Sequence, residues 1–116
     1  MIRGTTSQFK FKIPYKFDEL TNVMIKFWQP GNTNQNFPIV KTLQSCSRGK
    51  LITELFVSLT QTETLMFDDD KKGYVQLRAR LLDGTVFASK QCKFTIYQAQ
   101  DNSLFEPDDA PVDNNV

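Results

Sequence analysis

Apolar and polar residues alternate with a period of two along most of residues 1–97, a pattern typical of half-buried β-strands. In the segment Gln8–Ile13, the apolar side chains point to one side of such a strand, and Gln and Lys point to the other. No long segment places its apolar residues at helical spacing. The pattern therefore predicts an all-β chain, with further strands over Asn22–Gln29, Phe37–Leu43 and Leu51–Leu59.

The clearest of these patterns is a hairpin over Gly73–Ile96. Its first half alternates from Val75 to Leu81, and its second half runs back beside it. Between the halves, Asp83-Gly84 is a pair preferred in type I′ turns, where both central residues need a positive φ. A two-stranded ribbon is only marginally stable in water, so we expect the other strands to cover its apolar face.

Two short stretches between the strands favour helical turns. Thr60 and Glu63 fit the capping-box pattern, so a helix of about one turn is expected after Thr60. Tyr15–Leu20 fits a single turn that leads into the next strand. Because strands recur with turn residues between them, the chain is predicted to form an immunoglobulin-like antiparallel β-sandwich of about seven short strands.

Charge divides the chain into two parts. The chain has 116 residues, 40% of them hydrophobic, which suits one domain with a single core. Residues 1–97 carry 14 bases and 8 acids, whereas residues 98–116 carry 5 acids and no base. We therefore expect a sandwich domain over residues 1–97 and a flexible, extended, acidic tail over residues 98–116. Leu104 and Phe105 are an apolar pair within this tail, and they are predicted to dock on a neighbouring surface.

The sequence predicts no membrane segment. No apolar run reaches the roughly 18 residues of a membrane-spanning helix, and the first residues lack the apolar core of a signal peptide. We therefore expect a protein that is assembled in a cytoplasm. Cys46 and Cys92 are then interpreted as buried thiols, and the sequence leaves open whether they lie within disulfide distance.

The sequence contains no set of residues typical of an enzyme. Histidine is absent, which removes the commonest general base and metal ligand and every Ser-His or Cys-His pair. The consecutive acids Asp68–Asp70 could hold a hard cation, but they lack the alternating spacing of a calcium loop, and two lysines follow them. A solvated turn is the favoured interpretation, and we expect no catalytic activity, cofactor or metal.

Basic residues lie on the polar sides of several predicted strands. With aromatic residues nearby, such a surface could stack nucleic-acid bases as OB-folds do. Acids are mixed through the same segments and the acidic tail would compete, so nucleic-acid binding is not expected. The basic side is interpreted either as a solvated sheet face or as a face for an acidic neighbour. The residues concerned are Lys10, Lys12, Lys26, Arg78 and Arg80.

Three segments together resemble small structural proteins encoded by bacteriophages and prophages of Firmicutes-type gut bacteria. The chain is also similar to the N-terminal β-sandwich domain of phage baseplate upper proteins. The resemblance covers most of residues 1–97, and it implies a virion structural protein without catalytic residues. The segments are Met1-Ile2-Arg3-Gly4-Thr5-Thr6 with the following strand Phe9–Pro14, then Leu59-Thr60-Gln61-Thr62-Glu63-Thr64-Leu65-Met66-Phe67, then Val75-Gln76-Leu77-Arg78-Ala79-Arg80.

The resulting hypothesis is a bacteriophage virion structural protein, placed in the tail, neck or baseplate or serving as a capsid decoration or fibre base. Its expected partners are other virion proteins, with the chain itself a homo-oligomer or a multicopy component. Two alternatives stay open: a carbohydrate- or host-surface-binding module that uses Trp28 and the Asn32–Asn36 loop, and an OB-like nucleic-acid-binding barrel. The candidate partner-binding residues are Trp28, Arg78, Arg80, Leu104 and Phe105.

Overall fold

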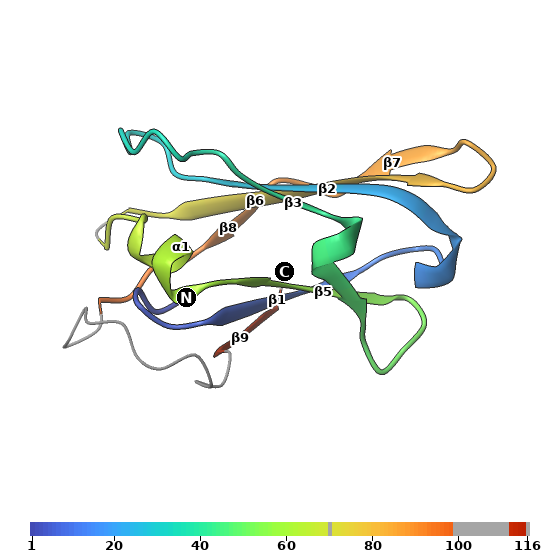
Figure 1. The fold of residues 1–116 in the computed structure, drawn as a ribbon, viewed down its shortest axis with the longest axis horizontal. Helices are drawn as coiled ribbons and strands as arrows, with labels where there is room; N and C mark the ends of the chain where they lie inside the picture. The colour runs from blue at the N-terminus through green and yellow to red at the C-terminus, as the bar shows by residue number, and fades with distance from the viewer. Residues whose placement is uncertain (70, 99–111, 116) are drawn as a thin grey trace.

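The computed structural model describes residues 1–69, 71–98 and 112–115, with 112–115 described by their backbone. These residues form two β-sheets that lie one above the other as two layers (Figure 1). The strand pairs are antiparallel except for one parallel pair at an edge of the first sheet. The predicted all-β sandwich is confirmed.

The first sheet is built on the antiparallel pair β1 and β5. Phe9 of β1 lies opposite Val57 of β5, and both side chains are buried between the sheets. The last strand, β9, pairs in parallel with β1, so that Val112 lies opposite Ser7. The strand order is β4 (Cys46–Arg48), β5 (Glu54–Leu59), β1 (Ser7–Lys12) and β9 (Val112–Asn115).

Strand β9 is made by residues that the sequence places in an extended tail. The segment Val112–Asn115 reads Val-Asp-Asn-Asn, which has neither apolar alternation nor a high β-propensity. Its pairing comes from the backbone groups at the open edge of β1, which any extended segment can satisfy. The strand therefore could not be predicted from side-chain pattern.

The second sheet is built on its two longest strands, β2 and β6. Their buried residues face each other across the pair, with Ile25 opposite Leu77 and Phe27 opposite Val75. Two short strands pair with different parts of β6, and one pairs with β2. The strands are β3 (Ile39–Thr42), β2 (Leu20–Trp28), β6 (Gly73–Leu81), β7 (Val86–Ala88) and β8 (Cys92–Phe94).

The turn of the predicted hairpin differs from the type I′ expectation. Gly84 has a φ of 90°, but Asp83 does not have a positive φ, so the prediction of a type I′ turn is wrong. The loop has three residues instead of two, and it is closed by hydrogen bonds from Gly84 N to Leu81 O (3.0 Å) and from Leu81 N to Thr85 O (2.8 Å). A glycine in the left-handed region at the third loop position is typical of three-residue hairpins.

The returning half of the hairpin is interrupted, which the alternation did not indicate. The pairing with β6 slips by one residue between β7 and β8. Ser89 lies at the slip, where its N–H donates to Leu77 O (2.8 Å) and its Oγ accepts from Leu77 N (3.0 Å). A slip of one residue exchanges the two faces of a strand, which is why Phe87 and Phe94, seven positions apart, both turn toward the core.

Phenylalanine rings connect the two layers. The ring centroids of Phe9 and Phe27 lie 5.0 Å apart and those of Phe9 and Phe94 lie 5.1 Å apart, in edge-to-face geometry. Phe67 extends the cluster, with its centroid 5.7 Å from Phe94 and 4.9 Å from Phe37. Edge-to-face pairs contribute about 0.5–1.5 kcal/mol beyond the area that they bury, so the cluster fixes how the sheets pack.

Short helical turns connect the strands, as predicted. Thr60 Oγ1 accepts a hydrogen bond from Glu63 N (3.2 Å), and Glu63 Oε1 accepts one from Thr60 N (2.9 Å), which confirms the capping box. The expected turn before β2 is also present. The helical segments are η1 (Phe17–Glu19), η2 (Leu43–Ser45) and α1 (Gln61–Leu65).

The strand predicted over Leu51–Leu59 begins only at Glu54. Strict alternation along Leu51–Leu59 would put Leu51 on the same side as the buried Leu55, Val57 and Leu59, but Leu51 is 60% exposed. The residues before β5 form a turn with its own hydrogen bonds, from Glu54 N to Leu51 O (3.0 Å) and from Leu51 N to Glu54 Oε1 (3.1 Å). These bonds close the turn locally and remove Leu51 from the sheet.

Candidate interaction face

The outer side of the second sheet carries the residues that stand out chemically. This sheet is the upper layer in Figure 1, and its outer side looks away from the first sheet. The strand registers place the outward-pointing residues in adjacent rows across β7, β6, β2 and β3. We call this surface the basic face; it consists of Asn22, Met24, Lys26, Trp28, Val40, Thr42, Tyr74, Gln76, Arg78, Arg80, Val86, Ala88 and Lys93.

The basic face carries four cations and no acid. Lys26, Arg78, Arg80 and Lys93 are exposed, and none of them forms an ion pair or a side-chain hydrogen bond with another described residue. The ion pairs found in the described part of the chain lie elsewhere, at Lys10–Glu54, Lys41–Glu63 and Lys71–Asp68. Like charges on one sheet face repel, so the face favours an anionic partner.

The nearest acid in the hairpin is already engaged. Asp83 lies in the turn beyond Arg80 and Val86, and its carboxylate accepts a hydrogen bond from Thr85 N at 2.9 Å. This hydrogen bond holds the pKa of Asp83 below its ordinary value, so the group is ionised at neutral pH. The Asp83 carboxylate therefore belongs to the turn, and the charge of the basic face stays positive.

A hollow of about 400 Å³ lies on the basic face, at the end near the hairpin turn. Arg78 and Arg80 line it, together with the exposed apolar side chains of Met24 and Val86. Val86 of the edge strand β7 is 52% exposed, and Met24 of the inner strand β2 is 42% exposed. Apolar side chains beside guanidinium groups are the composition of protein interfaces.

Trp28 lies on the same face, at one end of β2. Its ring stacks on Tyr74 of β6, with centroids 5.8 Å apart and planes inclined by 18°. Lys93 lies directly opposite Tyr74 on the neighbouring strand β8. The structure thus brings Trp28, Arg78 and Arg80 onto one surface, although Trp28 is about fifty residues from the two arginines in sequence.

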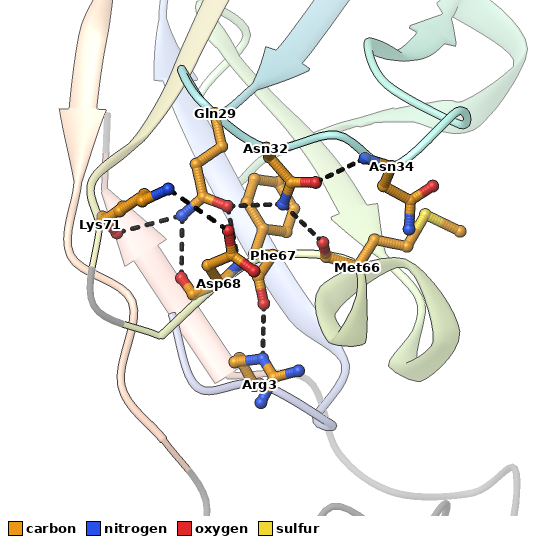
Figure 2. Close-up of polar contacts among 8 residues, drawn as sticks. All are labelled: Arg3, Gln29, Asn32, Asn34, Met66, Phe67, Asp68 and Lys71. Carbon is orange, nitrogen blue, oxygen red and sulfur yellow. Dashed lines mark hydrogen bonds and ion pairs between the residues drawn. The ribbon is translucent and has the colours of Figure 1, made fainter.

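The loop after Trp28 is held by a buried polar network (Figure 2). Gln29 Nε2 donates to Asp68 O (2.8 Å) and Lys71 O (3.2 Å), while Gln29 Oε1 accepts from Asp68 N (2.7 Å). Asn32 Nδ2 donates to Gln29 Oε1 and to Met66 O, both at 2.8 Å. The network ties two crossing loops together at one end of the sandwich.

This network bears on the carbohydrate alternative. The amide groups of Gln29 and Asn32 point into the protein in Figure 2, and the Asn34 Oδ1 accepts from Asn36 N at 2.9 Å. These groups are therefore not directed at a ligand stacked on Trp28.

The acidic cluster has no ligand geometry among the described residues. Asp68 is half-exposed and pairs with Lys71 at 3.8 Å, while Asp70 lies outside the described residues. Within residues 1–69, 71–98 and 112–115, no group of three or more His, Cys, Asp or Glu side chains lies close enough to hold a metal ion.

Cys46 and Cys92 are free thiols, and burial raises the pKa of Cys46 to about 11.

Other predicted site residues fall in different places. Lys10 and Lys12 belong to the outer side of the first sheet, opposite Phe56 and Glu54, so they are separate from the basic face. Leu104 and Phe105 lie outside the described residues.

The sequence did not indicate that Lys93, Val40 and Val86 belong to the basic face. The slip at Ser89 hides the outward position of Lys93, and a single exposed Val carries no signal in the sequence.

Comparison with known proteins adds no family. No family model and no curated protein sequence matches this chain. The helices of the described part of the chain are too short to cross a membrane. A functional assignment therefore depends on the sequence resemblance and on the geometry of the basic face.

Proposed function

We propose that this chain is a structural component of a bacteriophage particle and that it acts through protein–protein contacts made by the basic face. The resemblance of its three sequence segments to phage structural proteins supports the placement in a virion. Support for the contact role comes from a single observation: the basic face holds four cations that form no ion pair with another described residue, and two of them, Arg78 and Arg80, line a hollow with exposed Met24 and Val86. The tail, neck, baseplate and capsid surface are all positions that fit a domain of this kind.

A multicopy position suits these features. A single contact made by the basic face is weak, because exposed ion pairs contribute only about 0–1 kcal/mol each. In a particle, many copies lie at fixed spacing, so weak contacts combine through multivalency. The compact sandwich then acts as a rigid support that presents the face.

The two alternatives receive less support. A carbohydrate site at Trp28 would need polar groups around the ring, and the amides of Gln29 and Asn32, which follow Trp28 in the chain, are used within the protein. An OB-like barrel would need one closed sheet, whereas the described strands form two sheets that share no strand.

The proposed function is tested by the composition of purified particles. We expect quantitative mass spectrometry of virions from the phage or prophage that encodes this chain to find it at a fixed number of copies per particle. The copy number should be unchanged after washing with detergent and moderate salt. Absence from particles, with the protein found only in the lysate of the infected host, would contradict the proposed function.

A further inference from the structure

We infer that the basic face binds the acidic segment before the C-terminal strand, residues 98–111, of a second copy of this chain. This inference deepens the proposed contact role of the basic face by naming its partner. It rests on charge complementarity, on the apolar residues of both surfaces, and on where the C-terminal strand of the same molecule lies.

The two surfaces have opposite charge. The basic face holds Lys26, Arg78, Arg80 and Lys93, and it has no acid to neutralise them. Residues 98–111 contain four acids and no base. Arginine pairs well with carboxylates because its planar guanidinium can donate two parallel hydrogen bonds. Each surface therefore supplies the counter-charges that the other one lacks.

The apolar residues also match. Leu104-Phe105 is directly followed by Glu106, and Asp108-Asp109 comes two positions later. The hollow on the basic face combines exposed Met24 and Val86 with Arg78 and Arg80 in the same way. An apolar pair seated in the hollow would place the following acids beside the guanidinium groups. This arrangement gives a buried anchor surrounded by charge pairs, as in stable protein interfaces.

The position of β9 indicates that the partner is another molecule. Val112–Asn115 pairs with β1, at the edge of the first sheet. The basic face is the outer side of the second sheet, so it lies across the sandwich from β9 (Figure 1). The C-terminal strand of a given copy is thus held on the side away from its own basic face, and we therefore assign the preceding acidic segment to the basic face of a second copy.

The first test is sedimentation velocity of the full chain at increasing concentration. We expect the wild type to self-associate at low ionic strength and to dissociate at about 1 M salt, where charges are screened within about 3 Å. The double reversal Arg78→Glu/Arg80→Glu should abolish association. The control Arg48→Glu/Lys50→Glu makes the same change in net charge at exposed positions outside the basic face, and it should associate like the wild type.

A mixing experiment distinguishes contacts between molecules from contacts within one molecule. The variant Asp108→Lys/Asp109→Lys brings the net charge of residues 98–111 from −4 to 0, and on its own it should be monomeric like Arg78→Glu/Arg80→Glu. When the two variants are mixed, the unchanged basic face of the tail variant meets the unchanged acidic tail of the face variant, so heterocomplexes should form. Circular dichroism and cooperative thermal unfolding of every variant should match those of the wild type, which shows that the loss of association is not a loss of fold.

Three results would overturn the inference. The first is a wild type that stays monomeric over the whole concentration range. The second is a mixture that remains monomeric although both variants are folded. The third is salt-sensitive binding of a single-stranded oligonucleotide that Arg78→Glu/Arg80→Glu removes without any self-association, which would assign the face to nucleic acid. Self-association of a protein that is missing from virions would keep this inference and remove the proposed function.

Discussion

At the residue scale, Gln29 shows how one polar side chain holds two loops together. It is 4% exposed, and its amide makes hydrogen bonds with the backbone of Asp68 and Lys71 and with Asn32. Both ends of the amide are used, the nitrogen as donor and the oxygen as acceptor. The loop that begins with Pro30-Gly31 reads as a polar excursion in the sequence, and nothing in that pattern indicates the buried amide that secures it.

We predict that Gln29→Glu lowers the free energy of unfolding by more than about 2 kcal/mol, because an oxygen replaces the nitrogen that faces the Asp68 and Lys71 carbonyls. Urea denaturation monitored by tryptophan fluorescence measures the change. Gln35→Glu introduces the same charge at an exposed position of the same loop, and it should change stability little. Equal effects of the two substitutions would show that the network does not support the fold.

At the element scale, the hairpin over Gly73–Ile96 shows what alternation predicts and what it cannot. The strand β6 and its inward residues follow from the period of two, because each inward position packs against the other sheet. The three-residue turn and the slip at Ser89 do not follow, because they depend on backbone hydrogen bonds to Thr85 and Leu77. Slips of this kind re-aim side chains while leaving the local sequence ordinary.

The edge strand β9 leads to a second prediction. The buried apolar residues found in the described part of the chain all lie between Met1 and Ile96, so removal of residues 98–116 should leave cooperative unfolding intact. The truncated chain should be less stable than the full chain, because β1 loses its partner at the edge. Chemical denaturation of both proteins measures the difference, and non-cooperative unfolding of the truncated chain would contradict the domain boundary.

A double proline substitution tests the contribution of strand β9 separately from that of the rest of the tail. Neighbouring residues of a strand direct their N–H groups to opposite sides, so Asp113→Pro/Asn114→Pro removes one donor that points toward β1. We expect this full-length variant to lose about the same stability as the truncated chain. Asp108→Ala/Asp109→Ala, upstream of the strand, serves as the control and should retain the stability of the wild type.

At the scale of the whole molecule, the sandwich and its core could be predicted from the sequence, but the basic face only in part. Arg78 and Arg80 alternate with core residues on one strand, so their outward position could be predicted. Their neighbours Met24 and Val86 come from other strands, and only the pairing register brings them together. A face of this kind is a product of register, which no single segment of the chain encodes.

The central claim is that the basic face is the contact surface by which this chain enters a particle. The most direct measurement is the number of copies in purified virions assembled with Arg78→Glu/Arg80→Glu, compared with Arg48→Glu/Lys50→Glu, by quantitative mass spectrometry. Because the first variant loses two exposed ion pairs of about 0–1 kcal/mol each and places like charges opposite each other, the cost should reach the roughly 1.4 kcal/mol of a tenfold change. We therefore predict a fall of at least about tenfold for the first variant and none for the second. Equal incorporation of the two folded variants would contradict the claim.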